Sequence, residues 1–153
     1  MPGPLIRRVV TGHDAEGRAV IDIDEVKSDE RFTLIWTTEG FPVDNTDAAD
    51  GGQRDVGITL PGGTVFRIGE IAPGARSPMH RTNSVDYGIV LEGDLDMEVD
   101  GGEVVHLKAG DVVVQRGTNH AWVNNSGAPV KMAWILIAAH PVTIGEHVLE
   151  PTM

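Results

Sequence analysis

The stretch Gly74–Gly93, GARSPMHRTNSVDYGIVLEG, decides how the rest of the chain is interpreted. It carries His80, Thr82 and Asp86 at even spacings, just before the apolar run 89–91. In an extended chain, successive side chains alternate between two faces, so these three side chains share one face if the strand is unbroken. The pattern predicts a strand that lines a pocket with an imidazole, a hydroxyl and a carboxylate.

A second histidine, His120, follows forty residues later in GDVVVQRGTNHAWVN, residues 110–124. It again comes directly after a short run of β-forming residues. The functional question is therefore whether His80, Asp86 and His120 meet in the folded chain.

Composition narrows the class of protein. The chain has 153 residues, 41% hydrophobic and 23% charged, which is ordinary for one soluble domain with a real core. A net charge of −11 repels phosphate backbones and anionic membranes, so nucleic acid is not an expected partner. No apolar run approaches the ~20 residues of a membrane span, and the N-terminus lacks a signal-peptide core. We expect a cytoplasmic protein without membrane contact. Cysteine is absent, so any metal must be held by His, Asp, Glu and similar ligands.

The chain divides into an arm and a barrel. Residues 1–18 contain early prolines and glycine and form an N-terminal arm of the kind that lies on a neighbouring subunit's sheet. Residues 19–153 show many short strand patterns bounded by Gly, Pro and Asp, and no amphipathic helix longer than two turns. This pattern predicts an all-β sandwich or barrel. Residues 40–57 are polar and are interpreted as a solvated loop or a lid over a pocket.

Two spaced sets of residues match a known pattern. The first set is Gly74, His80, Thr82, Asp86 and Gly93, and the second is Gly110, Gly117, His120 and Asn124. Together they resemble the two motifs of the cupin superfamily, over roughly residues 60–140. The resemblance implies a cupin-type jelly-roll β-barrel of six or eight strands, often a homodimer, with a metal or small ligand in its mouth. The arm would add one or two extra strands.

The chain departs from the cupin pattern at three places. Thr82 stands where the first motif usually has a histidine, and Asp86 stands where it usually has a glutamate. Arg116–Gly117 replaces a Pro-x-Gly turn in the second motif, which is one residue shorter. These departures are expected to define the particular chemistry of this protein.

Carried over residue by residue, the resemblance makes His80, Asp86 and His120 the metal ligands. Two imidazoles and one carboxylate bind Fe(II), Mn(II), Zn(II) or Ni(II) on one face and leave positions open for substrate. The shorter Asp86 could instead orient a histidine or act as a general base. Thr82 could hold a water at the metal. Arg116 could bind a carboxylate or phenolate of an anionic substrate, or form a surface ion pair.

Other candidates are interpreted as structural. The remaining four histidines lack suitable neighbours and are taken as structural or solvated: His13, His106, His140 and His147. Tyr87 should face outward from its strand. Trp122 and Asn124 are expected to shape the second motif's turn and strand, and the orientation of Arg67 is left open.

Three functions fit these residues. The first is a metal-dependent enzyme that dehydrates, isomerises or cleaves a small oxygenated organic molecule by acid/base chemistry. The second is an Fe(II)-dependent oxygenase with a two-histidine, one-carboxylate centre. The third is a barrel that binds a small molecule without catalysis. The fold alone does not choose among them.

Overall fold

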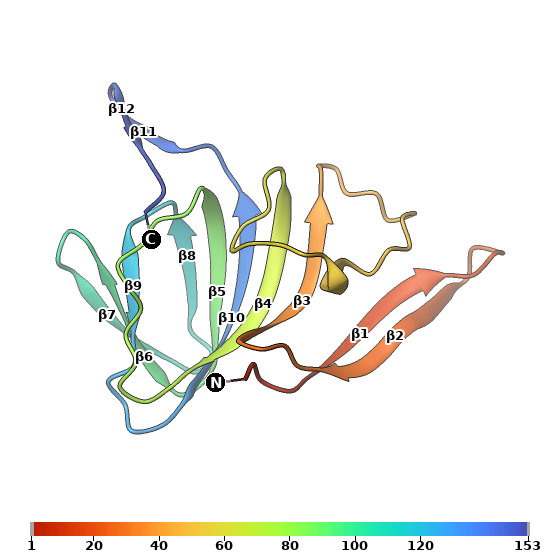
Figure 1. The fold of residues 1–153 in the computed structure, drawn as a ribbon, viewed down its shortest axis with the longest axis horizontal. Helices are drawn as coiled ribbons and strands as arrows, with labels where there is room; N and C mark the ends of the chain where they lie inside the picture. The colour runs from red at the N-terminus through yellow and green to blue at the C-terminus, as the bar shows by residue number, and fades with distance from the viewer. Residues whose placement is uncertain (1, 153) are drawn as a thin grey trace.

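The computed structural model describes residues 2–152, and strands dominate it (Figure 1). Five strands form one sheet, in the order β3 (Phe32–Glu39), β4 (Gly63–Ile71), β10 (Val130–Ala138), β5 (Ser84–Glu92) and β8 (Val112–Arg116). Three form a second sheet, in the order β7 (Val104–Lys108), β6 (Asp94–Val99) and β9 (His120–Val123). All pairs are antiparallel. The predicted all-β jelly-roll barrel is confirmed.

The interior of the barrel is apolar toward one end and polar toward the other. One cluster of buried side chains joins the two sheets: Val90, Leu95, Trp122, Val130 and Met132. Further along β5 and β9, and on the neighbouring β8, the inward-facing side chains Asp86, His120 and Gln115 are buried but polar. The apolar end supplies the hydrophobic stabilisation, and the polar end is available for chemistry.

The glycines of the two motifs occupy positions that other residues adopt only with strain. All four have positive φ angles: Gly74 at 77°, Gly93 at 90°, Gly110 at 92° and Gly117 at 65°. A side chain at Gly93 would also approach the Pro129 carbonyl oxygen to 2.9 Å. These glycines therefore end the strands and turn the chain back into the barrel.

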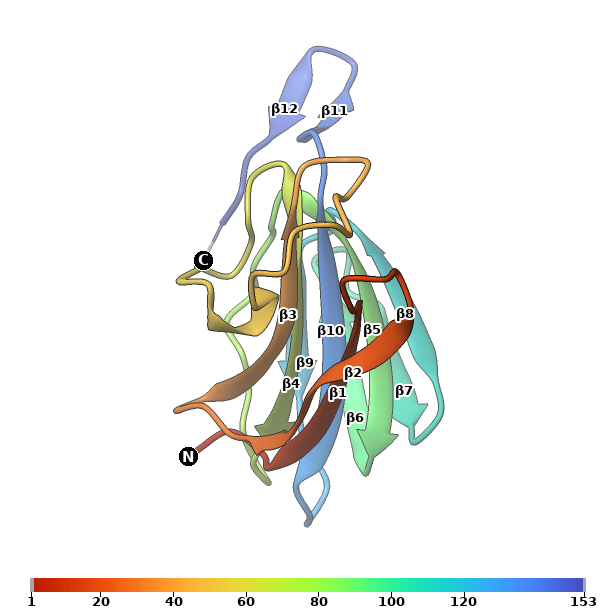
Figure 2. The ribbon, with the colours of Figure 1, turned by 90° about the vertical axis from the view of Figure 1, so that its right-hand side faces the viewer.

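The N-terminal arm is a separate hairpin. β1 (Ile6–His13) and β2 (Ala19–Lys27) pair with each other and with no other strand of residues 2–152. The hairpin projects away from the barrel in Figure 1, and in Figure 2, turned by 90°, it lies in front of the strands of the barrel. The sequence predicted that the arm ends at residue 18. The pairing instead places residues 19–27 in the arm, which contributes two strands, because alternation in 20–26 indicates a strand without indicating its partner.

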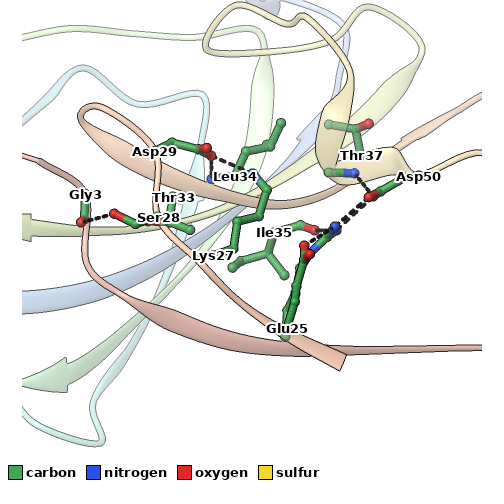
Figure 3. Close-up of polar contacts among 12 residues, drawn as sticks. Gly3, Glu25, Lys27, Ser28, Asp29, Thr33, Leu34, Ile35, Thr37 and Asp50 are labelled. Atoms are coloured by element: carbon green, nitrogen blue, oxygen red, sulfur yellow. Dashed lines mark hydrogen bonds and ion pairs between the residues drawn. The ribbon is translucent and has the colours of Figure 1, made fainter. Parts of the chain in front are cut away.

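A buried arginine, Arg8, fixes the hairpin to the barrel. Its partners Glu25, Ile35 and Asp50 are labelled in Figure 3. Arg8 is only 4% exposed, and its guanidinium donates to Glu25 at 2.7 and 2.9 Å, to Asp50 at 2.5 and 2.8 Å and to the Ile35 carbonyl at 3.1 Å. The guanidinium thus ties β1 to β2, to β3 and to the loop before the short helix η1 (Gly51–Gln53). Hydrogen bonds from Arg8 lower the pKa of Asp50 below its usual range.

The remaining elements lie at the C-terminal end of the described chain. β11 (Val142–Ile144) and β12 (His147–Leu149) form a small projecting hairpin. Beyond it, Thr152 pairs with Arg81, so the chain returns to the segment that carries the first motif. No helix within residues 2–152 has the length and apolar character needed to cross a membrane.

Replacing Arg8 tests its role as the anchor of the hairpin. Arg8→Met should lower the free energy of unfolding by about 2–3 kcal/mol, below the full cost of breaking a buried ion pair because both carboxylates keep some contact with water. Amide hydrogen exchange in residues 6–27 should become faster. Arg7→Met is the control, since Arg7 pairs with Asp24 on the exposed side of the same hairpin and should change exchange little. Equal exchange in both variants would show that Arg8 does not anchor the hairpin.

Candidate metal centre

The histidines of the two motifs are direct neighbours. His80 and His120 form an isolated antiparallel bridge, with N–H to carbonyl distances of 2.8 and 2.9 Å in the two directions. Their ring centroids are 4.3 Å apart, and the ring planes meet at 50°. The bridge joins the segment before β5 to β9 of the other sheet. The predicted meeting of the two histidines is therefore present in the structure.

The same nitrogen of each ring is fixed by a backbone carbonyl. His80 Nδ1 lies 2.8 Å from the Pro78 oxygen, and His120 Nδ1 lies 2.9 Å from the Thr118 oxygen. A carbonyl oxygen can only accept, so Nδ1 carries the hydrogen in both rings. The Nε2 lone pairs are left free, which is the arrangement found in metal-binding histidines whose other nitrogen donates to a carbonyl.

Burial shifts the pKa values of two groups in the site. His120 is 3% exposed, and burial, together with repulsion from His80, lowers the pKa of His120 to about 4 despite its hydrogen bond to Thr118. Its imidazole is therefore neutral at physiological pH, as a metal ligand must be. Burial raises the pKa of Asp86, and this effect outweighs its hydrogen bond from Ser84 and its attraction to His80.

A row of hydrogen bonds connects the residues of the first motif. Thr82 Oγ1 lies 2.7 Å from Ser84 Oγ, and Ser84 Oγ donates to Asp86 Oδ1 at 2.5 Å. The strand itself is interrupted, because β5 begins only at Ser84. The side chains nevertheless stay on one side, as the even spacing predicted. Ser84, which we did not single out from the sequence, is the buried link between the other two.

The fit of this site to a metal is partial. The two imidazoles match a divalent metal in ligand type and in a nitrogen that no protein group occupies, and His120 also matches it in charge because its lowered pKa keeps the ring neutral. Within residues 2–152, however, no three side chains of His, Asp or Glu lie close enough to hold a metal together. The structure thus pairs His80 with His120 but does not gather Asp86 with them. The arrangement of Asp86 agrees better with the second role that we considered, proton transfer beside the histidines.

Arg116 lies on the opposite side of the barrel wall from this site. In the pairing of β5 with β8, Asp86 stands opposite Gln115, and Val85 stands opposite Arg116. Gln115 is therefore the inward residue, 4% exposed, whereas Arg116 is exposed on the outer face. Of the two roles predicted for Arg116, the outer face agrees better with a surface position than with contact to a substrate inside the barrel, because alternate residues of a strand point to opposite faces. The same alternation would have identified Gln115.

The residues that were expected to be structural have positions that agree with structural roles. Tyr87 faces outward and is 46% exposed. Asn124 is fully buried and donates to the carbonyls of Ile71 and Ala128, so it shapes the turn after β9. Trp122 contacts the His120 ring edge to face, with centroids 5.3 Å apart. The four other histidines are exposed and lie outside the site: His13, His106, His140 and His147.

A large cleft lies outside the barrel. Its volume is about 1100 Å³, and it is bordered by the β1–β2 hairpin, β3 and residues 43–51. Neither candidate metal-binding histidine lines it. Most of the polar loop 40–57 therefore borders this outer cleft, through residues 43–51 and Arg54.

The fold and the paired histidines define a small jelly-roll protein with a candidate site inside its barrel. The family model for the cupin domain matches residues 67–136. The chain is 41% identical over 152 residues to phomopsin biosynthesis cluster protein C' of Diaporthe leptostromiformis, covering 90% of this chain and 80% of that protein. It is 34% identical over 157 residues to the cupin-domain-containing oxidoreductase fogC of Aspergillus ruber, covering 94% and 77%. The chain belongs to the cupin superfamily.

Solved structures resemble part of the chain. A Cupin 2 conserved barrel domain protein from Salinispora arenicola aligns with 54% of this chain and 67% of its own, at 25% identity and a TM-score of 0.46.

The buried neutral His120 should make stability depend on pH. Its pKa is about 4 in the folded protein and 6.5 in an unfolded chain. Between these values the unfolded state binds the extra proton, so the free energy of unfolding should rise with pH by about 3 kcal/mol. Asp86 has a raised pKa in the folded protein, so its contribution makes the free energy of unfolding fall as pH rises. The His120 contribution is therefore obtained from the difference between the pH profiles of the parent chain and the His120 variant.

Urea unfolding of metal-free protein across this pH range gives that difference. His120→Gln should lose the His120 contribution and show a flatter pH dependence than the parent chain. His147→Gln, at an exposed position, is the control and should keep the parent profile. Parallel profiles for the parent and His120→Gln would contradict the neutral, buried state of His120.

Proposed function

We propose that this chain is a metal-dependent oxidoreductase that acts on a small organic molecule, with His80 and His120 as the metal's protein ligands. The observation that carries the proposal is the pairing of two imidazoles whose Nε2 atoms are both free, because both Nδ1 atoms donate to carbonyls. Such a pair has no structural need for its free nitrogens, but it is suited to a divalent metal.

The similar proteins favour redox chemistry among the three functions that the sequence left open. Four relatives carry the name cupin-domain-containing oxidoreductase, among them fogC and virC, and others are named as members of the phomopsin and oryzine biosynthesis clusters. These names support an enzyme that oxidises or reduces a small molecule during a biosynthesis. When bound, iron or manganese would supply a redox centre and a Lewis acid, whereas zinc or nickel would chiefly supply the Lewis acid.

The protein's own residues have separable roles in this proposal. Pro78 and Thr118 hold the imidazoles in one tautomer through their carbonyls. Trp122 covers one side of His120 and limits access of water to it. Asp86 accepts a proton from substrate, because burial raises its pKa and brings it nearer to the range in which a carboxylate exchanges protons at neutral pH. Ser84 positions Asp86 by its hydrogen bond.

A second candidate is acid/base chemistry without a net change of oxidation state. The raised pKa of Asp86 and its hydrogen-bonded row favour it, since both serve proton transfer equally well in a dehydratase or isomerase. Oxygen consumption by iron-loaded protein separates the two functions. Turnover of a substrate without consumption of any oxidant would favour the lyase or isomerase.

Metal uptake tests the ligand assignment. Protein reconstituted separately with Fe(II), Mn(II), Ni(II) and Zn(II), then desalted, should retain about one ion per chain of at least one metal. His80→Ala and His120→Ala should each lose retention, and His147→Ala should keep it. The readout is metal content by mass spectrometry. Full retention in either site variant would refute the ligand pair, and no retention by the parent chain would favour the non-catalytic binding barrel.

Asp86→Asn separates a ligand from a proton acceptor. The amide nearly preserves the shape and the hydrogen bond from Ser84 but cannot accept a proton as a carboxylate does. Metal retention should stay at the parent level, while turnover should fall by a factor of about 100 or more, the usual loss for a general base. Loss of the metal in Asp86→Asn would make Asp86 a ligand instead. The homodimer and the cytoplasmic location stay predictions.

A further inference from the structure

One buried hydrogen-bond donor in the barrel has no acceptor. Among the side chains of residues 2–152, the buried nitrogen and oxygen atoms all have hydrogen-bond partners except Nε1 of Trp134. Trp134 lies on β10, opposite Gly88 of β5, and packs against the buried cluster. Buried indole N–H groups are normally paired, and an unpaired one costs about 1–3 kcal/mol. The barrel therefore offers a donor that a ligand or a water must satisfy.

An arginine without a carboxylate stands directly beside it. Arg67 of β4 is the cross-strand partner of Trp134, so the two side chains leave the sheet on the same face. Its guanidinium donates to the carbonyls of Gly57 and Ile58, the latter at 3.0 Å, and no Asp or Glu of the described chain forms an ion pair with it. Burial without a counter-ion lowers the pKa of Arg67. Two carbonyls use only part of the donor capacity of a guanidinium, which has five N–H bonds.

Aromatic rings connect this pair of donors to the candidate metal centre. Trp134 lies 6.4 Å from Trp122, and Trp122 lies 5.3 Å from His120, between ring centroids. On its other side, Trp134 contacts Phe32 edge to face at 5.6 Å. Trp134 is thus one ring away from His120, and aromatic rings pack on both of its sides.

The negative charge of the whole chain means that an anionic ligand needs a local cation at its binding site. With a net charge of −11, the protein repels anions at long range. An anionic substrate would need a local cation inside the barrel, and Arg116 does not supply it because that side chain lies on the outer face. Arg67 is half-buried, faces inward and carries no carboxylate partner, so it is suited to this task.

We propose that Arg67 and Trp134 form a subsite for the carboxylate of an aromatic organic acid, which the barrel binds beside the histidine pair. The guanidinium would donate to the carboxylate, Trp134 Nε1–H would donate to one of its oxygens, and the ring of the ligand would lie against Trp122 and Trp134. This inference rests on the proposed function, because it names the class of substrate on which the proposed enzyme would act. The binding itself does not require a metal.

Two simpler roles compete with this one. An ordered water could satisfy Trp134, and Arg67 could serve only to hold the loop through Gly57 and Ile58. Both roles predict that carboxylates bind no better than neutral amides of the same shape. The difference between a carboxylate and its amide is therefore the decisive comparison.

The experiment follows the indole N–H signals of the full-length, ¹⁵N-labelled chain by NMR. The chain has three tryptophans, so assignment by single Trp→Phe variants is direct. Benzoate and phenylacetate are titrated, with benzamide and phenylacetamide as neutral controls. Each titration is run on protein as purified and on protein dialysed free of metal, so its outcome is independent of whether the metal assignment holds.

Both carboxylates should shift the Trp134 signal and leave that of Trp36, which borders the outer cleft, in place. The amides should bind about tenfold or more weakly, as expected for loss of charge-assisted hydrogen bonds. Arg67→Gln should weaken carboxylate binding to the same extent, Arg67→Lys should restore part of it, and Arg18→Gln, the same charge change at the exposed hairpin tip, should have no effect.

Trp134→Phe provides a second route if the Arg67 variants fold poorly, since it removes the donor and keeps an aromatic ring. It should also weaken carboxylate binding. The proposal is overturned if neither carboxylate shifts the Trp134 signal, if the amides bind as well as the acids, or if Arg67→Gln binds like the parent chain. A failed metal assignment with intact carboxylate binding would leave this subsite standing and remove only the proposed redox function.

Discussion

Two backbone hydrogen bonds between His80 and His120 are the constraint on which the site depends. They join a segment that precedes β5 in one sheet to β9 in the other, and so they close the barrel at the point where both motifs meet. Once the backbones are bridged, the two imidazoles must lie side by side. The carbonyls of Pro78 and Thr118 then decide which nitrogen of each ring stays free.

The structure shows what the two departures of the first motif from the usual cupin pattern, Thr82 and Asp86, do in the folded chain. A histidine and a glutamate would have supplied two further metal ligands, whereas Thr82 and Asp86 are joined instead through Ser84 into a hydrogen-bonded row. Asp86 is thereby held by Ser84 as a buried carboxylate with a raised pKa, and it does not form a three-residue cluster with the two imidazoles. A site with fewer protein ligands and a stronger proton acceptor fits chemistry in which substrate occupies much of the metal's surroundings.

The pattern of short strands and turns predicted an all-β sandwich or barrel, and the resemblance to the two cupin motifs implied that the histidines meet. Gly74, Gly93, Gly110 and Gly117 need positive φ angles, and their spacing sets the strand lengths. Three features could not be read in this way. The partner of β2 depends on long-range pairing, the face of Arg116 depends on a register of one residue, and the unpaired Nε1 of Trp134 depends on packing around it. Ser84 was within reach, since it lies at the even position between Thr82 and Asp86.

The most direct test of the account is the tautomer of the two histidines in metal-free protein. Long-range ¹H–¹⁵N NMR at mildly alkaline pH reports which nitrogen of each ring carries the hydrogen. The account predicts that both His80 and His120 are protonated at Nδ1 and bare at Nε2, so that each ring has a lone pair that no protein group occupies. A hydrogen on Nε2 of either ring would contradict it, because the Nε2 atom assigned to the metal would then have no lone pair, and Nδ1 faces a carbonyl oxygen.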